Sequence, residues 1–214
     1  MLHVLTDTTS IADHYLAQLR DKEIQKDRAR FRGNMERLGM IMAYEISKTL
    51  DFERVAVNAQ LGTASANVLR ENPILLTVLR AGIPFYTGFL RIFDQSDTGF
   101  IGARRVEGGD SVKIKMDYVA TPDLKGKIVV LIDPMLATGK SITDSVSAVL
   151  SNGTPRHLHI ATLISAKAGI DEVTQNVKIP NTIWTYAVDE KLNDLFYIVP
   201  GLGDAGDLSF GDKI

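Results

Sequence analysis

The first fifty residues combine helical spacing of apolar side chains with dense charge. Residues 11–19 place their apolar positions on one helical face, and Ser10 with Asp13 fits a capping box before them. Charge is dense over residues 20–37. Asn34 can cap a second helix, in which apolar side chains recur over residues 35–46. The pattern predicts a helical N-terminal arm over residues 1–50.

From residue 55 onward, short β-rich runs alternate with helix-like stretches. This alternation is typical of βαβ units on a largely parallel sheet. We therefore expect an α/β fold with a mainly parallel central sheet flanked by helices, in one domain whose core spans residues 51–214. The predicted strands are 55–57, 74–79, 128–132, 159–164 and 182–187, and the predicted helices lie near 84–93, 141–151 and 166–175.

Two glycine-containing stretches interrupt this rhythm. Residues 99–118 end in alternating apolar positions and predict a β excursion, or hairpin, beside the sheet. Residues 200–214 contain four glycines and predict an ordered loop at the C-terminus.

Composition narrows the class of protein. Hydrophobic residues make up 45% of the 214 positions, which is enough for a packed core. With 24 basic against 26 acidic residues, the net charge of −2 argues against a protein that mainly coats nucleic acid. The absence of cysteine excludes disulfides, Cys-ligated metals and a thiolate nucleophile. The longest strongly apolar run, residues 128–132, is far below the roughly 20 residues that cross a bilayer. We expect a soluble cytoplasmic protein with no nucleic-acid or membrane partner.

The segment that can carry chemistry follows residues 128–132, which have the apolar character of a buried strand. They lead into Asp133-Pro134-Met135-Leu136-Ala137-Thr138-Gly139-Lys140-Ser141, and helical spacing begins there. In an open α/β sheet, ligands bind where strands end and helices begin, and a helix N-terminus is an anion site. Gly139 permits close approach, Thr138 and Ser141 add hydroxyl groups, and Lys140 adds positive charge. The pattern predicts a phosphate site here, with Asp133 directed toward the group joined to that phosphate.

Two other stretches resemble nucleotide-binding motifs but lack residues that those motifs require at a fixed spacing. Residues 139–141 end like a Walker A loop, but that motif needs glycine at position 134, which is Pro134. Residues 201–206 match GxGxxG, but the chain ends too soon for the helix, strand and acidic residue of a dinucleotide fold. His157 and His159 alternate along a predicted strand without a third ligand, so we expect no residue to bind a metal directly.

Residues 133–141 resemble the 5-phosphoribosyl-1-pyrophosphate (PRPP) motif of type I phosphoribosyltransferases. Leu79-Arg80-Ala81-Gly82, residues 101–105 and residues 197–207 further resemble the uracil phosphoribosyltransferase family. The similarity covers residues 30 to 211. It implies a type I phosphoribosyltransferase fold and transfer of ribose 5-phosphate from PRPP to uracil, giving UMP and pyrophosphate in pyrimidine salvage.

The resemblance also implies roles for individual residues. Asp133, Arg80 and Arg105 would be catalytic: Asp133 would bind the ribose hydroxyls near the developing positive charge, and the two arginines would clamp pyrophosphate. Adjacent Arg104 is the alternative to Arg105. Mg²⁺ would bind mainly through PRPP. The residues expected to contact PRPP are Arg80, Arg105, Asp133, Pro134, Met135, Leu136, Ala137, Thr138, Gly139, Lys140, Ser141 and Asp204.

Uracil presents two carbonyl acceptors around one N–H donor, a pattern that backbone groups can recognise. The family resemblance places Ile198, Gly203, Asp204 and Ala205 at the uracil. Asp204 would face the PRPP side, through water or metal.

Two expectations concern regulation and assembly. Arg30-Phe31-Arg32-Gly33-Asn34 precedes the predicted start of the second helix, so a GTP effector could bind there. The resemblance also implies a homo-oligomer, dimer or tetramer, and the methionine-rich helix over residues 35–46 could supply a buried contact.

Alternatives within the same fold remain open at this point. The chain could be a phosphoribosyltransferase-like regulator that binds RNA and senses pyrimidine nucleotides. It could also be a phosphoribosyltransferase for a purine or for orotate. The RNA alternative calls for a basic stripe with aromatic residues, which the net charge and the 7% aromatic content do not favour.

Overall fold

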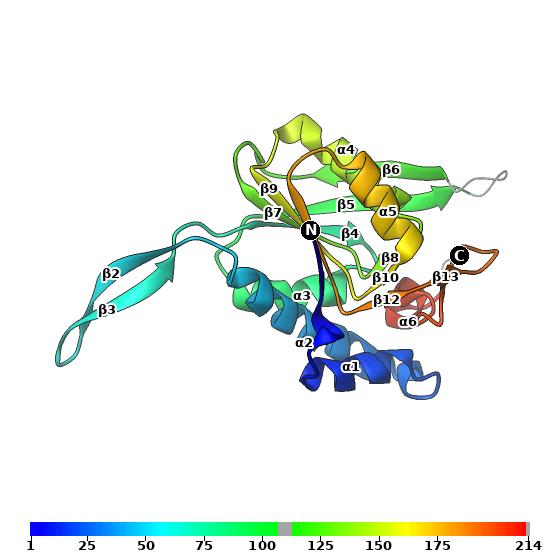
Figure 1. The fold of residues 1–214 in the computed structure, drawn as a ribbon, viewed down its shortest axis with the longest axis horizontal. Helices are drawn as coiled ribbons and strands as arrows, with labels where there is room; N and C mark the ends of the chain where they lie inside the picture. Colours follow the sequence, from blue (N-terminus) through cyan, green and yellow to red (C-terminus); the bar gives the residue numbers. More distant parts are fainter. Residues whose placement is uncertain (107–112, 213–214) are drawn as a thin grey trace.

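A seven-stranded sheet forms the centre of the molecule (Figure 1). The computed structural model describes the backbone of residues 1–106 and 113–212, and the side chains of residues 1–102 and 117–212. All neighbouring strands in this sheet are parallel except the last pair, β5 and β6. The prediction of a mainly parallel sheet is therefore confirmed. In spatial order the strands are β1 (Leu2–Val4), β11 (Asn181–Thr185), β9 (His157–Ala161), β7 (Ile128–Ile132), β4 (Ile74–Leu79), β5 (Thr98–Val106) and β6 (Lys113–Ala120).

Helices cover both faces of this sheet, because successive side chains of each buried strand point to opposite faces. One face packs on α1 (Ile11–Arg20), α2 (Arg28–Ser47) and α3 (Ile83–Ile92), and the other on α4 (Lys140–Val149) and α5 (Lys167–Asn176). In β7, Val130 and Ile132 belong to the first core, and Val129 and Leu131 to the second. No helix among the described residues is long and apolar enough to cross a membrane.

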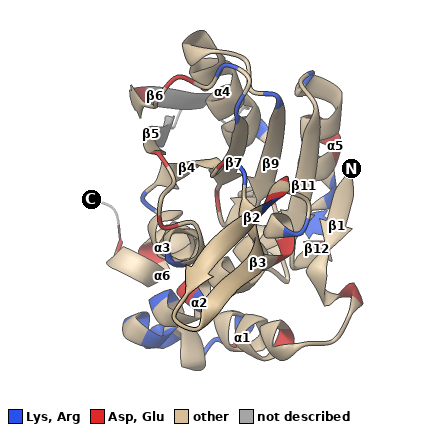
Figure 2. Cartoon of the chain, turned by 90° about the vertical axis from the view of Figure 1, so that its left-hand side faces the viewer, with Lys and Arg blue, Asp and Glu red and all other residues tan. Residues whose placement is uncertain are grey.

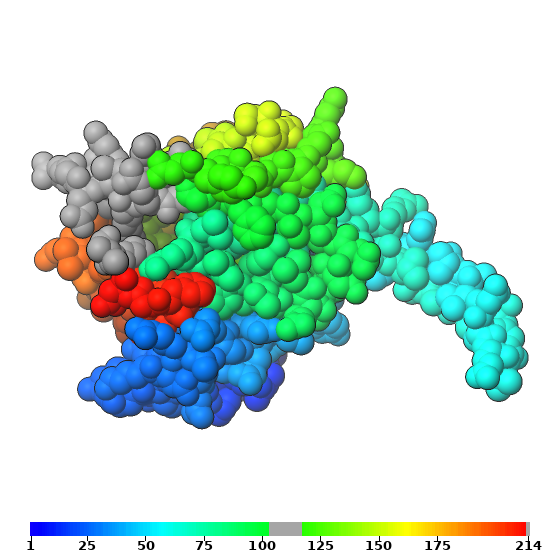
Figure 3. Space-filling view, turned by 180° about the vertical axis from the view of Figure 1, so that it is seen from behind, coloured from blue at the N-terminus to red at the C-terminus, as the bar shows by residue number. Residues whose placement is uncertain are grey.

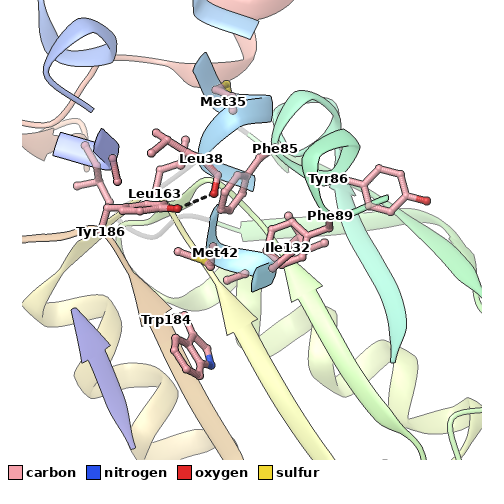
Figure 4. Packing of buried hydrophobic residues seen from close by; sticks show 14 of the residues in the cluster. Met35, Leu38, Met42, Phe85, Tyr86, Phe89, Ile132, Leu163, Trp184 and Tyr186 are labelled. Carbon is pink, nitrogen blue, oxygen red and sulfur yellow. Dashed lines mark hydrogen bonds between the residues drawn. The ribbon is translucent and has the colours of Figure 1, made fainter. Parts of the chain in front are cut away.

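The first core joins the N-terminal helices to the sheet (Figure 4). Met35, Leu38 and Met42 are fully buried against α3 and the strand ends. The hydroxyl of Tyr186 donates a hydrogen bond to the carbonyl oxygen of Leu38. These side chains of α2 pack within the chain, whereas Met40 and Tyr44 of the same helix are exposed, so the expectation that residues 35–46 supply an oligomer contact stays a prediction.

Helix α1 has the predicted capping box, in which Ser10 accepts from the N–H of Ala12 and Asp13 accepts from the N–H of Ser10. The predicted start of the second helix is wrong. Helix α2 begins at Arg28, because Asp27 accepts hydrogen bonds from the N–H groups of Ala29 and Arg30 and caps the helix there. Asn34 therefore lies inside the helix. Short 3-10 helices cover Leu5–Asp7, Ile24–Lys26 and Leu150–Asn152.

The strand predicted over residues 55–57 does not belong to the central sheet, which corrects the sequence prediction. It forms part of β2 (Phe52–Ala59), which pairs only with β3 (Gly62–Leu69) in an antiparallel hairpin. No residue of either strand is buried. The hairpin projects from the body of the molecule in Figures 1 and 3. The sequence signal failed because apolar alternation fixes the strand type but not the sheet that the strand joins.

Smaller elements line the carboxyl edge of the main sheet. A three-stranded parallel sheet contains β8 (Met135–Leu136), β10 (Ile164–Ala166) and β12 (Ala187–Asp189), and β13 (Lys191–Leu192) pairs with β14 (Ile198–Val199). The C-terminal stretch was predicted as a loop, but it also contains the short helix α6 (Ala205–Phe210). Asp204 caps this helix by accepting from the N–H groups of Gly206 and Asp207.

A histidine–tryptophan cluster joins the neighbouring strands β1, β11 and β9, of which β1 is at the edge of the sheet. The indole Nε1–H of Trp184 donates to Nδ1 of His159 at 3.0 Å, and His3 stacks on the indole at 4.2 Å between ring centroids. Burial, together with the neighbouring His157 and His3, lowers the pKa of His159 to about 3. His159 is therefore neutral in the folded protein at neutral pH, and Trp184 is a core residue.

This cluster predicts acid sensitivity. A histidine in the unfolded chain has a pKa of about 6.5. Below that pH the unfolded chain therefore binds a proton at His159, whereas folded His159 stays neutral. Stability should fall as pH drops from about 6.5 toward 3, by about 1.4 kcal/mol per pH unit from this residue. His159→Asn keeps an acceptor for Trp184 and should flatten this dependence. Urea unfolding followed by fluorescence of Trp184, the single tryptophan, measures it. Exposed His14→Gln is the matched control, and an unchanged slope in His159→Asn would refute the assignment.

Candidate active site at the carboxyl edge of the sheet

Asp133 lies directly after β7, at the carboxyl edge of the parallel sheet. Its N–H donates to the carbonyl oxygen of Ala161 on β9, which continues the strand pairing by one residue. The Asp133 residue is only 8% exposed, and its Oδ1 accepts from the N–H of Met135 at 3.4 Å. The sheet thus fixes one carboxylate at the position where open α/β sheets bind ligands.

The loop after Asp133 is anchored on both sides. The carbonyl oxygen of Pro134 accepts from the N–H groups of Leu163 and Ile164, and β8 then pairs with β10. Gly169, in α5, lies so close to this loop that a Cβ there would be 2.6 Å from the carbonyl oxygen of Ala137. These contacts hold in place the loop that leads from Asp133 into α4.

Helix α4 begins at Lys140 with Gly139 as its N-cap, and no side chain caps its first turn. Gly139 has φ +82°, and a Cβ there would lie 2.7 Å from Cβ of Glu172. Only glycine fits this conformation and this space. Thr138 and Ser141 are half-buried beside the uncapped helix start, while Lys140 is exposed. The partial positive charge and the N–H groups of the helix start suit a phosphate.

Arg80 lies after β4, the neighbour of β7. Its Nη2 donates to Oδ1 of Asp207 at 3.2 Å and to the carbonyl oxygen of Gly211 at 3.1 Å. The side chain is 41% exposed, so it can exchange these partners for a ligand. Asp207 lies within the C-terminal motif but was not predicted as a site residue. Asp207 lies 127 positions after Arg80 in the sequence, so only the folded structure shows that the two side chains are in contact.

The turn that carries Arg80 adjoins both other segments. Thr77 in β4 donates through its hydroxyl to the carbonyl oxygen of Ile132, the residue before Asp133. A Cβ on Gly206 would lie 3.7 Å from the Cβ of Ala81. Three segments that are far apart in the sequence therefore meet at one edge of the sheet.

The C-terminal segment presents the residues predicted at the base. Ile198 and Ala205 are buried, and Gly203 has φ +89°. One oxygen of Asp204, Oδ1, caps α6, a local structural role that sequence reasoning did not predict. The predicted contact of Asp204 with the PRPP side stays a prediction. Arg105 lies in β5, paired in the backbone with Ile114, but the side chains of Arg105 and Arg104 lie outside the described residues.

The segment predicted as an effector site divides between two surfaces. Arg30, Gly33 and Asn34 help line an open pocket of about 400 Å³ between α1 and α2. Phe31 is buried in the core, and Arg32 instead donates to the carbonyl oxygen of Ser209. The prediction that residues 30–34 precede a helix start is wrong, since α2 begins before this segment. The pocket is completed by Tyr15, Gln18, Ala29 and Arg37.

The chain is similar to known proteins over nearly its whole length. A family model described as uracil phosphoribosyltransferase matches residues 5–212. A uracil phosphoribosyltransferase from Porphyromonas gingivalis is 41% identical over 206 residues, covering 96% of this chain and 95% of that protein. One from Methanothermobacter thermautotrophicus is 41% identical, covering 86% of this chain and 85% of that protein. The solved structure of the AQ2163 protein from Aquifex aeolicus has a TM-score of 0.88 at 31% identity, and the match covers 100% of both chains.

Proposed function

The chain belongs to the uracil phosphoribosyltransferase family, and we propose on that basis that it transfers ribose 5-phosphate from PRPP to uracil, giving UMP and pyrophosphate. The observation that carries this proposal is the family match over residues 5–212. In the reaction, the bond from the anomeric carbon to the pyrophosphate oxygen breaks, and N1 of uracil bonds to that carbon. The N1 proton passes to solvent.

Asp133 supports the step that separates charge. Positive charge develops at the anomeric carbon as pyrophosphate departs. A carboxylate held at the end of β7 would accept hydrogen bonds from the ribose hydroxyls and stabilise that charge. Its burial, at 8% exposed, limits screening by water. Departure of pyrophosphate, rather than removal of the uracil proton, would then dominate the barrier.

The start of α4 would hold the 5′-phosphate of PRPP. Support comes from the uncapped first turn and from Gly139, whose missing side chain leaves the backbone accessible. The hydroxyls of Thr138 and Ser141 and the charge of Lys140 would add to the site. Residues 134–137 would contact PRPP through their backbone groups.

Arg80 and Arg105 would clamp pyrophosphate, because a guanidinium presents planar donors that match phosphate oxygens. For Arg80, the supporting observation is its position after β4, one strand away from Asp133. Pyrophosphate would replace Asp207 and the carbonyl of Gly211 as its partners.

Uracil would bind against residues 198–205, with backbone N–H and C=O groups recognising its edge. The positive φ of Gly203 and the absence of its side chain permit this approach. Buried Ile198 and Ala205 would pack beside the ring.

The chain's residues fit a Mg²⁺ ion that arrives with PRPP. Among the described residues no group of three or more His, Asp or Glu could hold a metal. Mg²⁺ is commonly held by substrate phosphates with one or two carboxylates, and Asp133 and Asp204 are the carboxylates proposed to face PRPP. When bound, the ion would neutralise charge on the departing pyrophosphate.

The activity is tested by incubating the protein with Mg²⁺, PRPP and a panel of bases and measuring pyrophosphate and nucleotide. We expect UMP from uracil, with little product from cytosine, hypoxanthine or orotate. No UMP in the presence of an active control enzyme would reject the proposal. Product mainly from another base would keep the reaction class and change the substrate.

The hairpin of β2 and β3 supports assembly into a homo-oligomer. Residues 55–69 carry no charged side chain, and Val57, Leu61 and Val68 are exposed. A two-stranded hairpin is at best marginally stable alone, and uncharged exposed strands pair readily with other chains. A second copy of this chain would cover the hairpin.

Replacing residues 53–68 with a short Gly-Ser linker should therefore lower the oligomeric state, measured by light scattering after size exclusion. The control variant is Gln60→Ser in the exposed turn of the hairpin, which keeps both strands and the exposed apolar side chains and should leave the oligomeric state unchanged. An oligomer of unchanged size in the deletion variant would show that the hairpin makes no such contact.

The pocket between α1 and α2 supports a GTP effector site, since Arg30 and Arg37 both line it. Lys and Arg gather where α2 begins (Figure 2). Arg30→Gln should raise the GTP concentration for half-maximal activation about tenfold, because a hydrogen bond to a charged group is worth about 1.5–3 kcal/mol. Lys26→Gln, which alters an exposed pair with Glu23, is the control. Equal GTP titrations for Arg30→Gln and the parent would remove the idea.

A further inference from the structure

The C-terminal segment that would contact the base is held by the N-terminal helices. Figure 3 shows the end of the chain lying directly over the first helices. Arg20, the last residue of α1, reaches Asp189 at the end of β12, 169 positions later in the sequence. Arg20 also reaches Gly201, in the loop that leads to Gly203. Sequence analysis singled out neither Arg20 nor Asp189, and Gly201 entered it only as part of the C-terminal motif.

Arg20, Asp189 and Gly201 form a closed ring of hydrogen bonds. Both terminal nitrogens of Arg20 donate to the two carboxylate oxygens of Asp189, at 2.8 and 2.9 Å. Nη1 of Arg20 also donates to the carbonyl oxygen of Gly201 at 3.0 Å, and the N–H of Gly201 donates to Oδ2 of Asp189 at 2.9 Å. Both polar backbone groups of Gly201 are thereby fixed by one ion pair.

This ion pair is well placed to determine a backbone position. Asp189 is 8% exposed, and the Arg20 side chain is 24% exposed. Burial alone would raise the pKa of the Asp189 carboxyl, but the hydrogen bonds from Arg20 and Gly201 bring the pKa below its ordinary value. The pair therefore stays charged at neutral pH, and its two-point geometry is more directional than a single contact.

The backbone at Gly201 is itself constrained. Gly201 has φ +59°, and a Cβ there would lie 2.1 Å from the carbonyl oxygen of Ile198. The chain therefore folds back on Ile198 immediately before Leu202 and Gly203. A shift at Gly201 would move Ile198 and Gly203, which both belong to the proposed base site.

Two more contacts from the same N-terminal region hold this segment. With its amide oriented to satisfy both neighbours, Gln25 donates to the carbonyl oxygens of Leu19 and Leu202, at 3.1 and 2.8 Å. Arg32 donates to the carbonyl oxygen of Ser209 at 2.7 Å. Residues on both sides of Gly203 are thus tied to residues 20–32, so the N-terminal region can set the position of the whole segment.

We infer that Arg20 and Asp189 are positioning residues for base recognition, which place the backbone groups of residues 198–205 at the edge of uracil without touching it. This inference rests on the proposed function. Recognition by backbone groups depends on their position, because a misplacement of about 1 Å can cost a large factor in reactivity. The pair should govern the affinity for the base and leave the affinity for PRPP to the loop after Asp133.

The test compares Arg20→Gln and Asp189→Asn with the parent enzyme in steady-state kinetics and thermal unfolding. Each variant removes one charge and leaves the other without its charged partner, buried in the case of Asp189 and half-buried in the case of Arg20. Each should raise KM for uracil about tenfold or more while KM for PRPP changes less than about twofold. The preference for uracil over cytosine, as a ratio of kcat/KM, should also fall. The double variant should be no worse than either single variant, because the two residues act as one unit.

Two further variants keep the test decisive. Arg20→Lys retains the charge but not the two-point geometry, so it should fold even if Arg20→Gln does not, and its KM for uracil should still rise. Arg91→Gln, which breaks the exposed pair between Arg91 and Glu36, is the control and should match the parent. Equal changes in both KM values, or a loss of kcat that only follows the folded fraction, would overturn the inference. Unchanged kinetics would overturn it as well. A parent enzyme that makes no UMP would instead reject the proposed function.

Discussion

Asp133→Asn lowers kcat by about 100- to 1,000-fold and changes KM for PRPP by less than about threefold. This is the result expected if the carboxylate acts mainly on the charge of the transition state, because such interactions affect kcat rather than ground-state binding. Asparagine keeps the size of the side chain and an acceptor for the N–H of Met135, so the loop should keep its shape. Steady-state kinetics with PRPP varied at saturating uracil measure both constants.

A matched control for this variant is Asp171→Asn, which alters an exposed acidic residue in α5. Its kinetics should match those of the parent. If Asp133→Asn raised KM for PRPP in proportion to its loss of rate, the residue would contribute uniform binding. The assignment of Asp133 to the transition state would then be wrong.

Arg80→Gln lowers kcat/KM for PRPP by about 100- to 1,000-fold, because the departing pyrophosphate loses a charged donor positioned to stabilise it. Arg80→Lys should recover only a small part of this loss, since an ammonium group lacks the planar pair of donors. Initial rates at varied PRPP measure both effects.

The control for Arg80 must separate chemistry from anchoring, because Arg80 also holds the C-terminal segment through Asp207. Asp207→Asn removes that ion pair and leaves the guanidinium in place. An exposed pair contributes about 0–1 kcal/mol, so Asp207→Asn should change kcat/KM by less than about tenfold. Equal losses in Arg80→Gln and Asp207→Asn would mean that Arg80 only anchors the segment.

The buried parts of the fold could be predicted from sequence because each signal was local and strong. The run over residues 128–132 is apolar throughout, and it forms β7 as predicted. The helix predicted near residues 141–151 was also found, since α4 begins at Lys140 directly after Gly139. The helix over residues 84–93 was found within one residue, because its apolar face packs directly on the sheet.

Other features depend on distant partners or on competing local signals. Asn34 is a good cap by residue type, but Asp27 occurs first and starts α2. Residues 52–69 alternate like sheet strands, yet nothing in their sequence says that they pair only with each other. The contacts of Arg20 with Asp189 and of Arg80 with Asp207 span 169 and 127 positions, so no local pattern could reveal them.

The most direct test of the account is a crystal structure of the protein with PRPP and Mg²⁺ bound. The account predicts the 5′-phosphate at the N–H groups of residues 137–141 and the ribose hydroxyls within hydrogen-bond distance of the Asp133 carboxylate. The pyrophosphate should contact Arg80. A 5′-phosphate bound elsewhere, with the start of α4 empty and Asp133 away from the ribose, would contradict it.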